Sequence, residues 1–308
     1  MSKEKPLISL VLLSYNQTAY IEDAIKGVLG QTYQNLEIIL SDDCSPDDTF
    51  ALIKKLVSDY RGPHTIVLNK NDVNLGLISH VNKAFEMASG EIVVLAAGDD
   101  ISLPTRVSDI VEQFAKDDSI YSVSTSFIRI DEHNNPISKM NIFDKDYYTY
   151  DDYCTVGVIP IFGCSRAYRR EVFSFFGPLK SYASVEDATL VFRSILLGKS
   201  YHINKVGLHY RVLSGSLSSG INLNTHIGKN RQRTDDTKLA IKKGLRVEKA
   251  LIKLQKHKLE LISMESILDR FESEDFSMLY FIKNILLSEK FNKYYKYYLL
   301  KQVFSKRK

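Results

Sequence analysis

The chain has 308 residues, of which 44% are hydrophobic, and its 41 Lys and Arg against 37 Asp and Glu leave a formal net charge of +4. This composition supplies enough apolar material for one large α/β domain with a smaller appendage. No stretch approaches the ~20 apolar residues of a membrane-spanning helix, so the sequence excludes an integral membrane protein and favours a soluble or peripheral one.

Two local features concern the cellular setting. Cys44, Cys154 and Cys164 show no metal-ligand spacing and cannot form an even set of disulfides, which favours a reduced, cytoplasmic environment. The apolar run at residues 7–13 is short and lacks a small-residue cleavage site. It therefore predicts a first strand rather than a secretory signal.

Strand-like runs alternate with helical patterns over the first 118 residues. The predicted strands are residues 7–14, 36–41, 65–68 and 91–97. The predicted helices are residues 18–29 and 77–88, one that opens at Ser45 with Ser45 as its N-cap, and one that opens at Pro104. This alternation is typical of a doubly wound nucleotide-binding fold, whose ligands lie at the carboxyl ends of the strands.

Strands and helices do not alternate regularly in the second half of the chain. The pattern predicts strands at residues 121–130 and 201–212, a turn at 131–136, and helices at 166–175 and 185–197. Residues 214–220 are rich in Ser and Gly and predict a flexible loop, which would be either a lid or a plain linker. From about residue 225 the sequence is Lys-rich and Leu-rich with helical periodicity.

Two acidic pairs stand where predicted strands end. Asp42 and Asp43 follow the strand at residues 36–41, and Asp99 and Asp100 follow the strand at residues 91–97. Carboxylates gathered at one edge of a sheet repel one another unless a cation or a hydrogen-bonding ligand compensates them. The four residues therefore indicate a binding site.

Several motifs in this order resemble the family 2 glycosyltransferases. The resemblance covers about residues 7–215 and rests on the segments Ser9–Asn16, Gln31–Ile39, Ser41–Thr49, Asn69–Gly76, Asn82–Ala84 and Ala88–Glu91. It implies a GT-A-like nucleotide-diphospho-sugar transferase fold, with a central mixed, mostly parallel sheet flanked by helices and a C-terminal helical extension. It also implies a catalytic domain over residues 1–220.

The resemblance places the nucleotide on the ends of the first, second and fourth strands. Asp43 would read the base, since a carboxylate accepts a hydrogen bond from a ring N–H. The alternative is that Asp42 or Asp43 caps the next helix. The implied nucleotide-binding set is Leu13, Ser14, Tyr15, Asn16, Asp42, Asp43, Asn74, Gly76 and Asp99.

Gly98-Asp99-Asp100 stands at the metal-binding motif of that family. The resemblance assigns Asp100 to a divalent cation, Mn²⁺ or Mg²⁺, and Asp99 to the ribose or the same metal, because a diphosphate calls for a hard cation. This chain has Ala97 where the commoner form has another Asp, which leaves one fewer oxygen ligand. The alternative is a solvated turn before Pro104.

Glu186 and Asp187 resemble the acidic motif that carries the catalytic base. Asp187 would deprotonate the acceptor hydroxyl, with Glu186 supporting it or contacting the acceptor. The alternative is a capping-box start at Ser184 for the following helix. Gly163 and Cys164 fall in the segment that lines the acceptor side. Leu213 stands where many relatives carry a His, so no metal role is transferred there.

Residues 221–308 form a basic, Tyr-rich region. They carry 20 Lys and Arg against 10 Asp and Glu, an excess of +10, which leaves −6 for residues 1–220. Apolar positions at helical spacing in residues 281–308 suit either a helix in an anionic membrane interface or a helix packed on the catalytic domain. No readout motif accompanies the charge, so nucleic acid is not an expected partner.

Together these features predict an inverting, metal-dependent glycosyltransferase of the hexosyltransferase class. It would move a sugar from a nucleotide-sugar donor, with a UDP-sugar expected, to a hydroxyl of a glycan or lipid-linked acceptor. The family commonly builds bacterial capsule, lipopolysaccharide and other surface polysaccharides, and the protein would be cytoplasmic or peripheral on the inner face of the plasma membrane. The alternatives are a sugar-nucleotide pyrophosphorylase and an inactive, transferase-like binding subunit.

Overall fold

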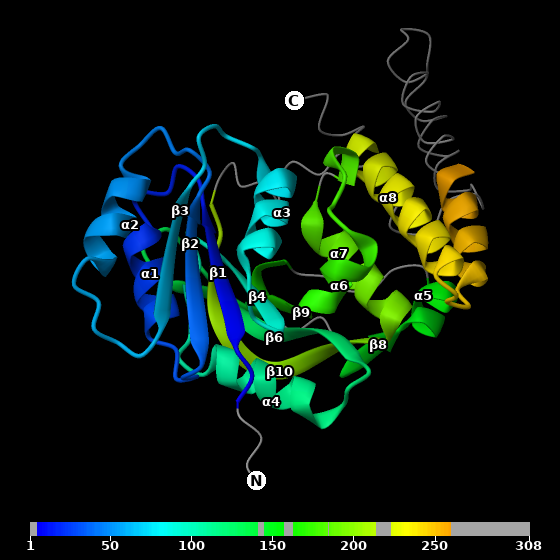
Figure 1. Cartoon of the computed structure of the whole chain (residues 1–308), viewed down its shortest axis with the longest axis horizontal. Helices are drawn as coiled ribbons and strands as arrows, with labels where there is room; N and C mark the ends of the chain where they lie inside the picture. The colour runs from blue at the N-terminus through cyan, green and yellow to red at the C-terminus, as the bar shows by residue number, and fades with distance from the viewer. Residues whose placement is uncertain (1–4, 141–144, 157–162, 184, 214–222, 260–308) are drawn as a thin grey trace, which may run out of the picture.

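The computed structural model describes residues 5–140, 145–156, 163–183, 185–213 and 223–259 (Figure 1). The strands are β1 Ile8–Ser14, β2 Leu36–Asp42, β3 Thr65–Lys70, β4 Ile92–Ala97, β5 Ile101–Ser102, β6 Ile120–Ile130, β7 Pro136–Met140, β8 Tyr147–Thr149, β9 Arg166–Arg169 and β10 Lys199–Arg211. The α-helices are α1 Ile21–Leu29, α2 Thr49–Val57, α3 Leu77–Met87, α4 Arg106–Lys116, α5 Tyr150–Val156, α6 Arg170–Phe176, α7 Glu186–Leu197 and α8 Leu223–Lys242. The short 3-10 helices are η1 Gly163–Ser165 and η2 Ser181–Ala183, and residues 248–259 are also helical.

One mixed sheet runs through the molecule in the order β3-β2-β1-β4-β9-β6-β10-β5, with β7 paired to β6 and β8 to β10. Its longest ladders, β1 with β2 and β4, β2 with β3, and β6 with β10, are parallel. The short strand β9 lies antiparallel between β4 and β6 and joins the two parallel halves. The mixed, mostly parallel sheet expected from the sequence is confirmed.

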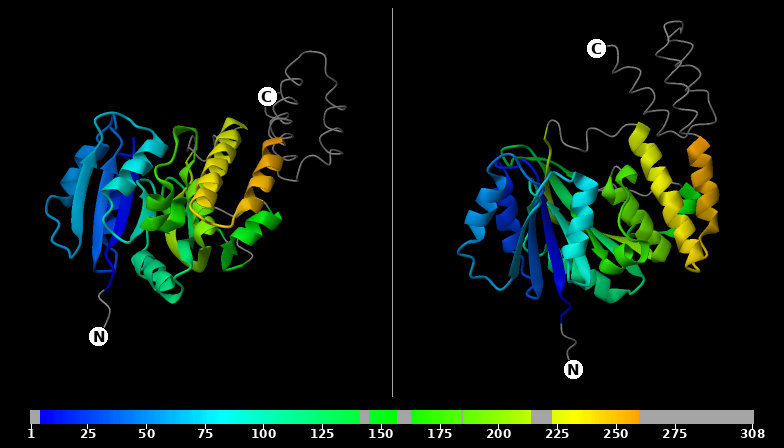
Figure 2. Two further views of the ribbon diagram at one scale, coloured as in Figure 1. Left: turned by 45° about the vertical axis from the view of Figure 1, so that its right-hand side comes forward. Right: turned by 45° about the horizontal axis from the view of Figure 1, so that its top comes forward.

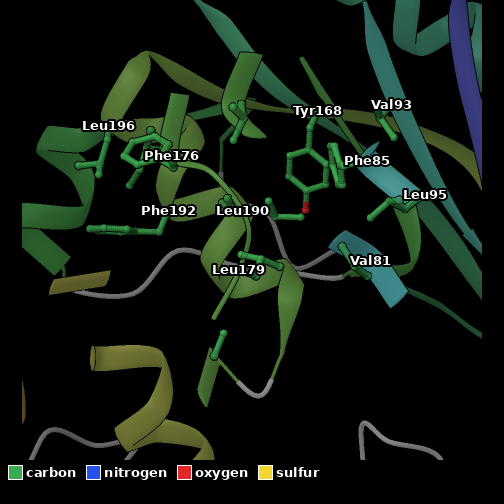
Figure 3. Close-up of a cluster of buried hydrophobic side chains, with 14 of the residues drawn as sticks. Val81, Phe85, Val93, Leu95, Tyr168, Phe176, Leu179, Leu190, Phe192 and Leu196 are labelled. Atoms are coloured by element: carbon green, nitrogen blue, oxygen red, sulfur yellow. The ribbon is translucent and has the colours of Figure 1, made fainter. Parts of the chain in front are cut away.

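Helices cover both faces of the sheet, which explains why its central strands are apolar on both sides. Alternate residues of β1 enter two cores: Leu10 and Leu12 pack with α1 and α4, whereas Val11 packs with α3, α6 and α7. Figure 3 shows the second core, where Tyr168 of β9 and Phe85 of α3 meet side chains of β4 and α7. The strands that carry the acidic pairs are therefore held from both sides.

The predicted elements of the first half are present within a few residues of their expected bounds. Two expectations about local structure were wrong. Residues 166–169 were expected to be helical but form β9, and the helix begins only at Arg170. The helix after Asp48 has no N-cap at Ser45, because it begins at Thr49 and the Thr49 amide instead donates to Asp47 Oδ1 at 3.1 Å.

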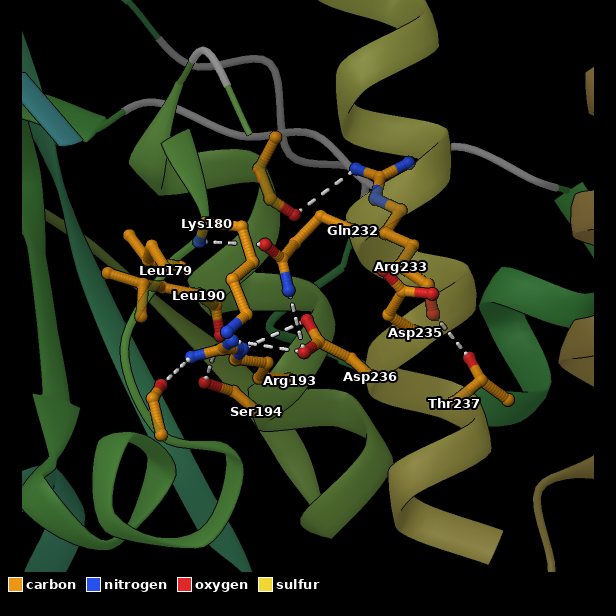
Figure 4. Close-up of polar contacts among 12 residues, drawn as sticks. Leu179, Lys180, Leu190, Arg193, Ser194, Gln232, Arg233, Asp235, Asp236 and Thr237 are labelled. Carbon is orange, nitrogen blue, oxygen red and sulfur yellow. Dashed lines mark hydrogen bonds and ion pairs between the residues drawn. The ribbon is translucent and has the colours of Figure 1, made fainter. Parts of the chain in front are cut away.

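Helix α8 packs beside α7 and η2, which belong to the layer on one face of the sheet (Figures 1 and 2). At its centre the buried Arg193 guanidinium of α7 donates to both carboxylate oxygens of Asp236, at 2.9 and 3.0 Å (Figure 4). Gln232 continues the contact by accepting a hydrogen bond from the Lys180 amide at 2.9 Å. The predicted boundary at residue 220 remains a prediction, but α8 packs on the same core as the helices before it.

We expect Asp236→Ala to lower the free energy of unfolding by about 3–5 kcal/mol, because it leaves the Arg193 charge buried and unpaired. The matched control is Asp235→Ala on the exposed face of α8, which removes only a hydrogen bond from the Tyr182 hydroxyl and should cost about 1 kcal/mol or less. Urea denaturation followed by circular dichroism measures both. Equal losses in the two variants would show that the ion pair does not hold α8.

The other strands and the helix predicted for the second half are present as β6, β10 and α7. The Ser/Gly loop at residues 214–220 and the basic segment 281–308 lie outside the described residues. Within the described part of the chain, no helix is long and apolar enough to cross a membrane.

Candidate active site

The two acidic pairs lie at one edge of the sheet because their strands are parallel neighbours of β1. Backbone hydrogen bonds continue past the strand ends, from the Asp43 amide to the Ser14 carbonyl and from the Gly98 amide to the Leu13 carbonyl, both at 2.9 Å. Residues 13–16, 42–43 and 98–100 therefore form one rim. This is the position at which open α/β sheets bind ligands.

Asp42 is buried and its carboxylate is used within the protein. Its Oδ1 accepts the Ser45 amide at 2.9 Å and its Oδ2 accepts the Ser45 hydroxyl at 2.5 Å. The Ser45 hydroxyl in turn accepts the Asn16 amide at 2.9 Å, which ties the loop after β1 to the loop after β2. Asp42 thus shapes the rim, and it does not cap α2.

Asp43 organises the loop that follows β3. Its Oδ1 accepts the Asn71 side-chain amide at 2.8 Å and the Leu75 backbone amide at 2.9 Å, and its Oδ2 accepts the Gly76 amide at 2.9 Å. Gly76 has a φ of +74°, which favours glycine, and its amide also donates to Asn74 Oδ1 at 2.8 Å. The predicted residues Asp43, Asn74 and Gly76 therefore belong to one hydrogen-bonded unit.

Apolar side chains on this rim and on the neighbouring loop after β3 face solvent. Tyr15, Val73 and Leu75 are 45%, 60% and 40% exposed, although each is large and hydrophobic. An aromatic ring beside an ordered loop is suited to stack on a flat ring system. This part of the rim can therefore accommodate a nucleobase.

One carboxylate oxygen of Asp100 accepts no hydrogen bond from the described residues. Its Oδ1 accepts the Arg211 amide at 2.9 Å, whereas its buried Oδ2 has no hydrogen-bond partner among the described residues. Burial, with the adjacent charge of Asp99, raises the pKa of the Asp100 carboxyl well above its ordinary value. Burial also raises the pKa of Asp99. A buried carboxylate with one free oxygen fits a positively charged ligand.

Two buried arginines hold this turn. Arg106 of α4 donates to the Leu95 carbonyl at 2.7 Å and to the Cys164 carbonyl at 3.1 Å, linking β4 to η1. Arg211 at the end of β10 donates from Nε to the Asp99 carbonyl at 2.9 Å and packs over the Tyr20 ring at 4.6 Å from its centroid. The turn at Asp99 and Asp100 is thus held by one arginine from α4 and one from β10.

The residues present fit a divalent cation in part. The described residues contain no group of three or more His, Cys, Asp or Glu side chains that could enclose a metal. The free Oδ2 of Asp100 supplies one oxygen, Asp99 is its neighbour, and Ala97 supplies none. Mn²⁺ and Mg²⁺ sites in phosphate-binding enzymes often use one or two carboxylates and complete their shell with phosphate oxygens and water. Such a site matches this donor set.

Glu186 and Asp187 begin α7, and η1 lies against them. A Cβ atom added to Gly163 would stand 3.0 Å from Glu186 Oε1 and 3.1 Å from Asp187 Oδ2, so the two segments are in contact. Burial raises the pKa of the Cys164 thiol well above its usual range, and the charges of Asp100 and of Asp187 both add to this increase. Cys164 is therefore close enough to Asp100, the predicted metal ligand, and to Asp187, the predicted base, for both charges to affect its pKa.

The pKa of Glu186 is raised to about 7 by burial and by the neighbouring charge of Asp187. Since its pKa in the unfolded chain is lower, Glu186 stabilises the fold most at acidic pH, and this contribution is lost as the pH rises through about 7. We expect Glu186→Gln to raise the melting temperature at pH 8 relative to the parent, with a smaller gain at pH 5. The control Glu132→Gln, at a side chain 65% exposed, should change neither value. If Glu186→Gln and the parent differ in melting temperature by the same amount at pH 5 and pH 8, the pKa of Glu186 is not raised.

Sequence reasoning missed the side chains that hold the site together. Arg106 and Arg211 were not among the candidate residues, although both are nearly fully buried. Arginine is usually exposed, and no spacing marks the buried ones. The only available signal was that Arg106 follows Pro104 at a helix start next to the acidic turn.

The mixed, mostly parallel sheet with helices on both faces is the GT-A fold. Staphylococcus aureus TarS residues 1–349, solved in complex with UDP-GlcNAc, superimposes with a TM-score of 0.64 at 16% identity, over 83% of this chain and 71% of that one. The Pyrobaculum calidifontis mannosyltransferase PcManGT, solved with GDP-Man and Mn²⁺, gives 0.60 at 17% identity, over 97% and 86%. Both have the GT-A fold.

Residues 9–176 match the sequence model of glycosyl transferase family 2, which is more than half of the chain. The protein belongs to this family and is a glycosyltransferase. Among its curated relatives, the Escherichia coli UDP-Glc:alpha-D-GlcNAc-diphosphoundecaprenol beta-1,3-glucosyltransferase WfaP is 28% identical over 220 residues, which are 69% of this chain and 80% of the relative.

Proposed function

We propose that this glycosyltransferase inverts the anomeric centre of a sugar as it moves that sugar from a nucleoside diphosphate to an acceptor hydroxyl. The proposal is supported by two observations: Asp43 and Asp100 lie at one edge of the sheet, and η1 lies against Asp187 at the start of α7. Arg106 links β4 to η1 through the Cys164 carbonyl at 3.1 Å, and η1 in turn contacts the start of α7.

Each segment has its own task in this proposal. The rim residues Tyr15 and Asp43 bind the nucleoside, and Asp99 contacts the ribose or the metal. Asp100, with Asp99, holds Mn²⁺ or Mg²⁺, which when bound offsets the charge of the departing diphosphate. Asp187 takes the proton from the acceptor hydroxyl. Attack by that hydroxyl from the side opposite the diphosphate inverts the configuration.

The donor and acceptor classes are proposed from the relatives. UDP is the nucleotide in the names of WfaP and of the TarS complex, so a UDP-sugar is the first donor to test. WfaP acts on a diphosphoundecaprenol-linked sugar, which supports a lipid-linked or glycan acceptor in bacterial surface polysaccharide synthesis. We place the protein in the cytoplasm or on the inner face of the plasma membrane, where such donors and acceptors meet.

A panel assay tests the proposal. UDP-glucose, UDP-N-acetylglucosamine and GDP-mannose are offered with Mn²⁺ and with glycan or decyl-diphosphate-linked sugar acceptors, and the nucleoside diphosphate and the product's anomeric configuration are measured. We expect one donor to release nucleoside diphosphate and give an inverted linkage. A retained linkage would overturn the inverting mechanism. Donor binding with no turnover on any acceptor would favour the inactive binding subunit.

A further inference from the structure

Helix α8 reaches the start of α7, where the proposed base lies. Arg233 Nη2 donates to the carbonyl of Ala188, the residue after Asp187, at 3.2 Å. Its guanidinium also packs over the Phe192 ring of α7 at 5.4 Å from the centroid. Figure 4 shows Arg233 on α8 together with Gln232 and Asp236, which fasten the same helix to its neighbours. The face of α8 that carries Arg233 therefore packs against the first turns of α7.

Lys229 lies on that face, one helical turn before Arg233. Its side chain is partly buried, and the charges of Asp187 and Glu186 both act on it. His226, one residue short of a further turn, is buried and has its pKa lowered to about 4 by burial and by the charges of Lys229 and Arg233. His226 is thus neutral at physiological pH, which leaves Lys229 and Arg233 as the cations on this face.

Lys229 differs from Arg193 and Arg233 in having no direct partner among the described residues. Arg193 is paired with Asp236, and Arg233 is bonded to Ala188. In contrast, Lys229 makes no hydrogen bond or ion pair with any residue that the structure describes, although two carboxylates lie nearby. A lysine present only to neutralise Glu186 and Asp187 would gain most from direct contact with them. Its separation from them is consistent with a ligand that bridges the gap.

We propose that Lys229 extends the acceptor side of the active site and binds a phosphate group attached to the acceptor sugar. The inference rests on the proposed function, because it takes Asp187 as the base that receives the acceptor hydroxyl. One acceptor molecule could donate a hydrogen bond from its hydroxyl to Asp187 and form an ion pair between its phosphate and Lys229. A neutral glycan would leave the Lys229 ammonium without a partner. The preferred acceptor is therefore a sugar linked through a phosphate or diphosphate.

The test compares the parent with Lys229→Met, Lys229→Gln and the control Lys238→Met, which removes an exposed charge from the same helix. Calorimetry without added metal measures binding of decyl diphosphate, methyl diphosphate and decyl β-D-glucoside. We expect both Lys229 variants to bind the two diphosphates about tenfold more weakly, as the loss of one charge-assisted contact implies. Glucoside binding and the Lys238 variant should match the parent. Melting temperatures within about 2 °C of the parent show that the variants are folded.

The three probes separate the possible sources of the phosphate. Equal losses for methyl and decyl diphosphate assign Lys229 to the phosphate itself, whether lipid-linked or part of a glycan. A loss confined to the decyl compound assigns it to a lipid-linked phosphate. If Lys229→Met binds both diphosphates as the parent does, the proposal is overturned. Because binding needs no turnover, this result is independent of Asp187→Asn, whose failure to reduce transfer would instead refute the proposed function.

Discussion

Asp187→Asn is expected to lower kcat/KM for transfer by at least about 100-fold while leaving donor affinity within about twofold of the parent. A positioned general base contributes roughly 10²–10⁴-fold, and an asparagine of nearly the same shape cannot accept the acceptor proton. In the proposed site the donor binds at Asp43 and Asp100, which this substitution leaves unchanged. Nucleoside diphosphate release measures transfer, and calorimetry measures donor binding.

The control for this substitution is Asp59→Asn, at a side chain 96% exposed on the segment after α2. It removes the same charge from a position that contacts no proposed site residue, so its kcat/KM should equal that of the parent. If Asp187→Asn transfers sugar as fast as Asp59→Asn, Asp187 is not the base. The partly buried Glu186 would then be the next candidate, since its pKa of about 7 also suits proton transfer.

Asp100→Asn is expected to have the second large effect, with opposite signs for activity and stability. Loss of the free Oδ2 charge should abolish the Mn²⁺ dependence of donor binding and lower kcat/KM by about 100-fold, which corresponds to several kcal/mol of lost charge stabilisation. The same change removes a buried carboxylate whose Oδ2 has no partner among the described residues. The metal-free variant should therefore melt at a temperature at least about 2 °C higher.

Thermal melts with and without Mn²⁺ and UDP measure both effects. The parent should gain stability when both ligands are added, because ligands that bind only the folded state stabilise it. The Asp100 variant should gain little. A variant that melts lower without metal, and still gains as much from Mn²⁺ as the parent, would show that Asp100 is a structural residue and not a metal ligand.

The sequence was sufficient to predict the rim because its strands are buried on both faces. Strands such as β1 and β2 are almost continuously apolar, so the polar residues at their ends stand out. Parallel pairing with β1 then brings Asp43 and Asp99 to the same edge. The family resemblance supplied the order of the motifs and so the GT-A fold.

The sequence was not sufficient to predict how the rim is held. Asp42 and Asp43 could not be distinguished from the sequence. In the structure the Asp42 carboxylate accepts hydrogen bonds from Ser45, whereas the Asp43 carboxylate accepts them from the loop after β3. Capping rules favoured Ser45 as a helix start, but its amide and hydroxyl both donate to the Asp42 carboxylate and the helix begins only at Thr49. Arg211 contacts Asp99 from 112 positions away in the sequence. Contacts of that separation leave no local pattern.

In the proposed active site a donor and a cation meet at Asp100, near Asp187. A crystal structure with UDP and Mn²⁺ tests this directly, because Mn²⁺ can be located by its anomalous scattering. We predict a peak about 2.2 Å from Asp100 Oδ2, with the uracil on the Tyr15 and Asp43 rim and the diphosphate turned toward the start of α7. A manganese peak remote from Asp100, or a nucleotide bound on another face, would contradict the account.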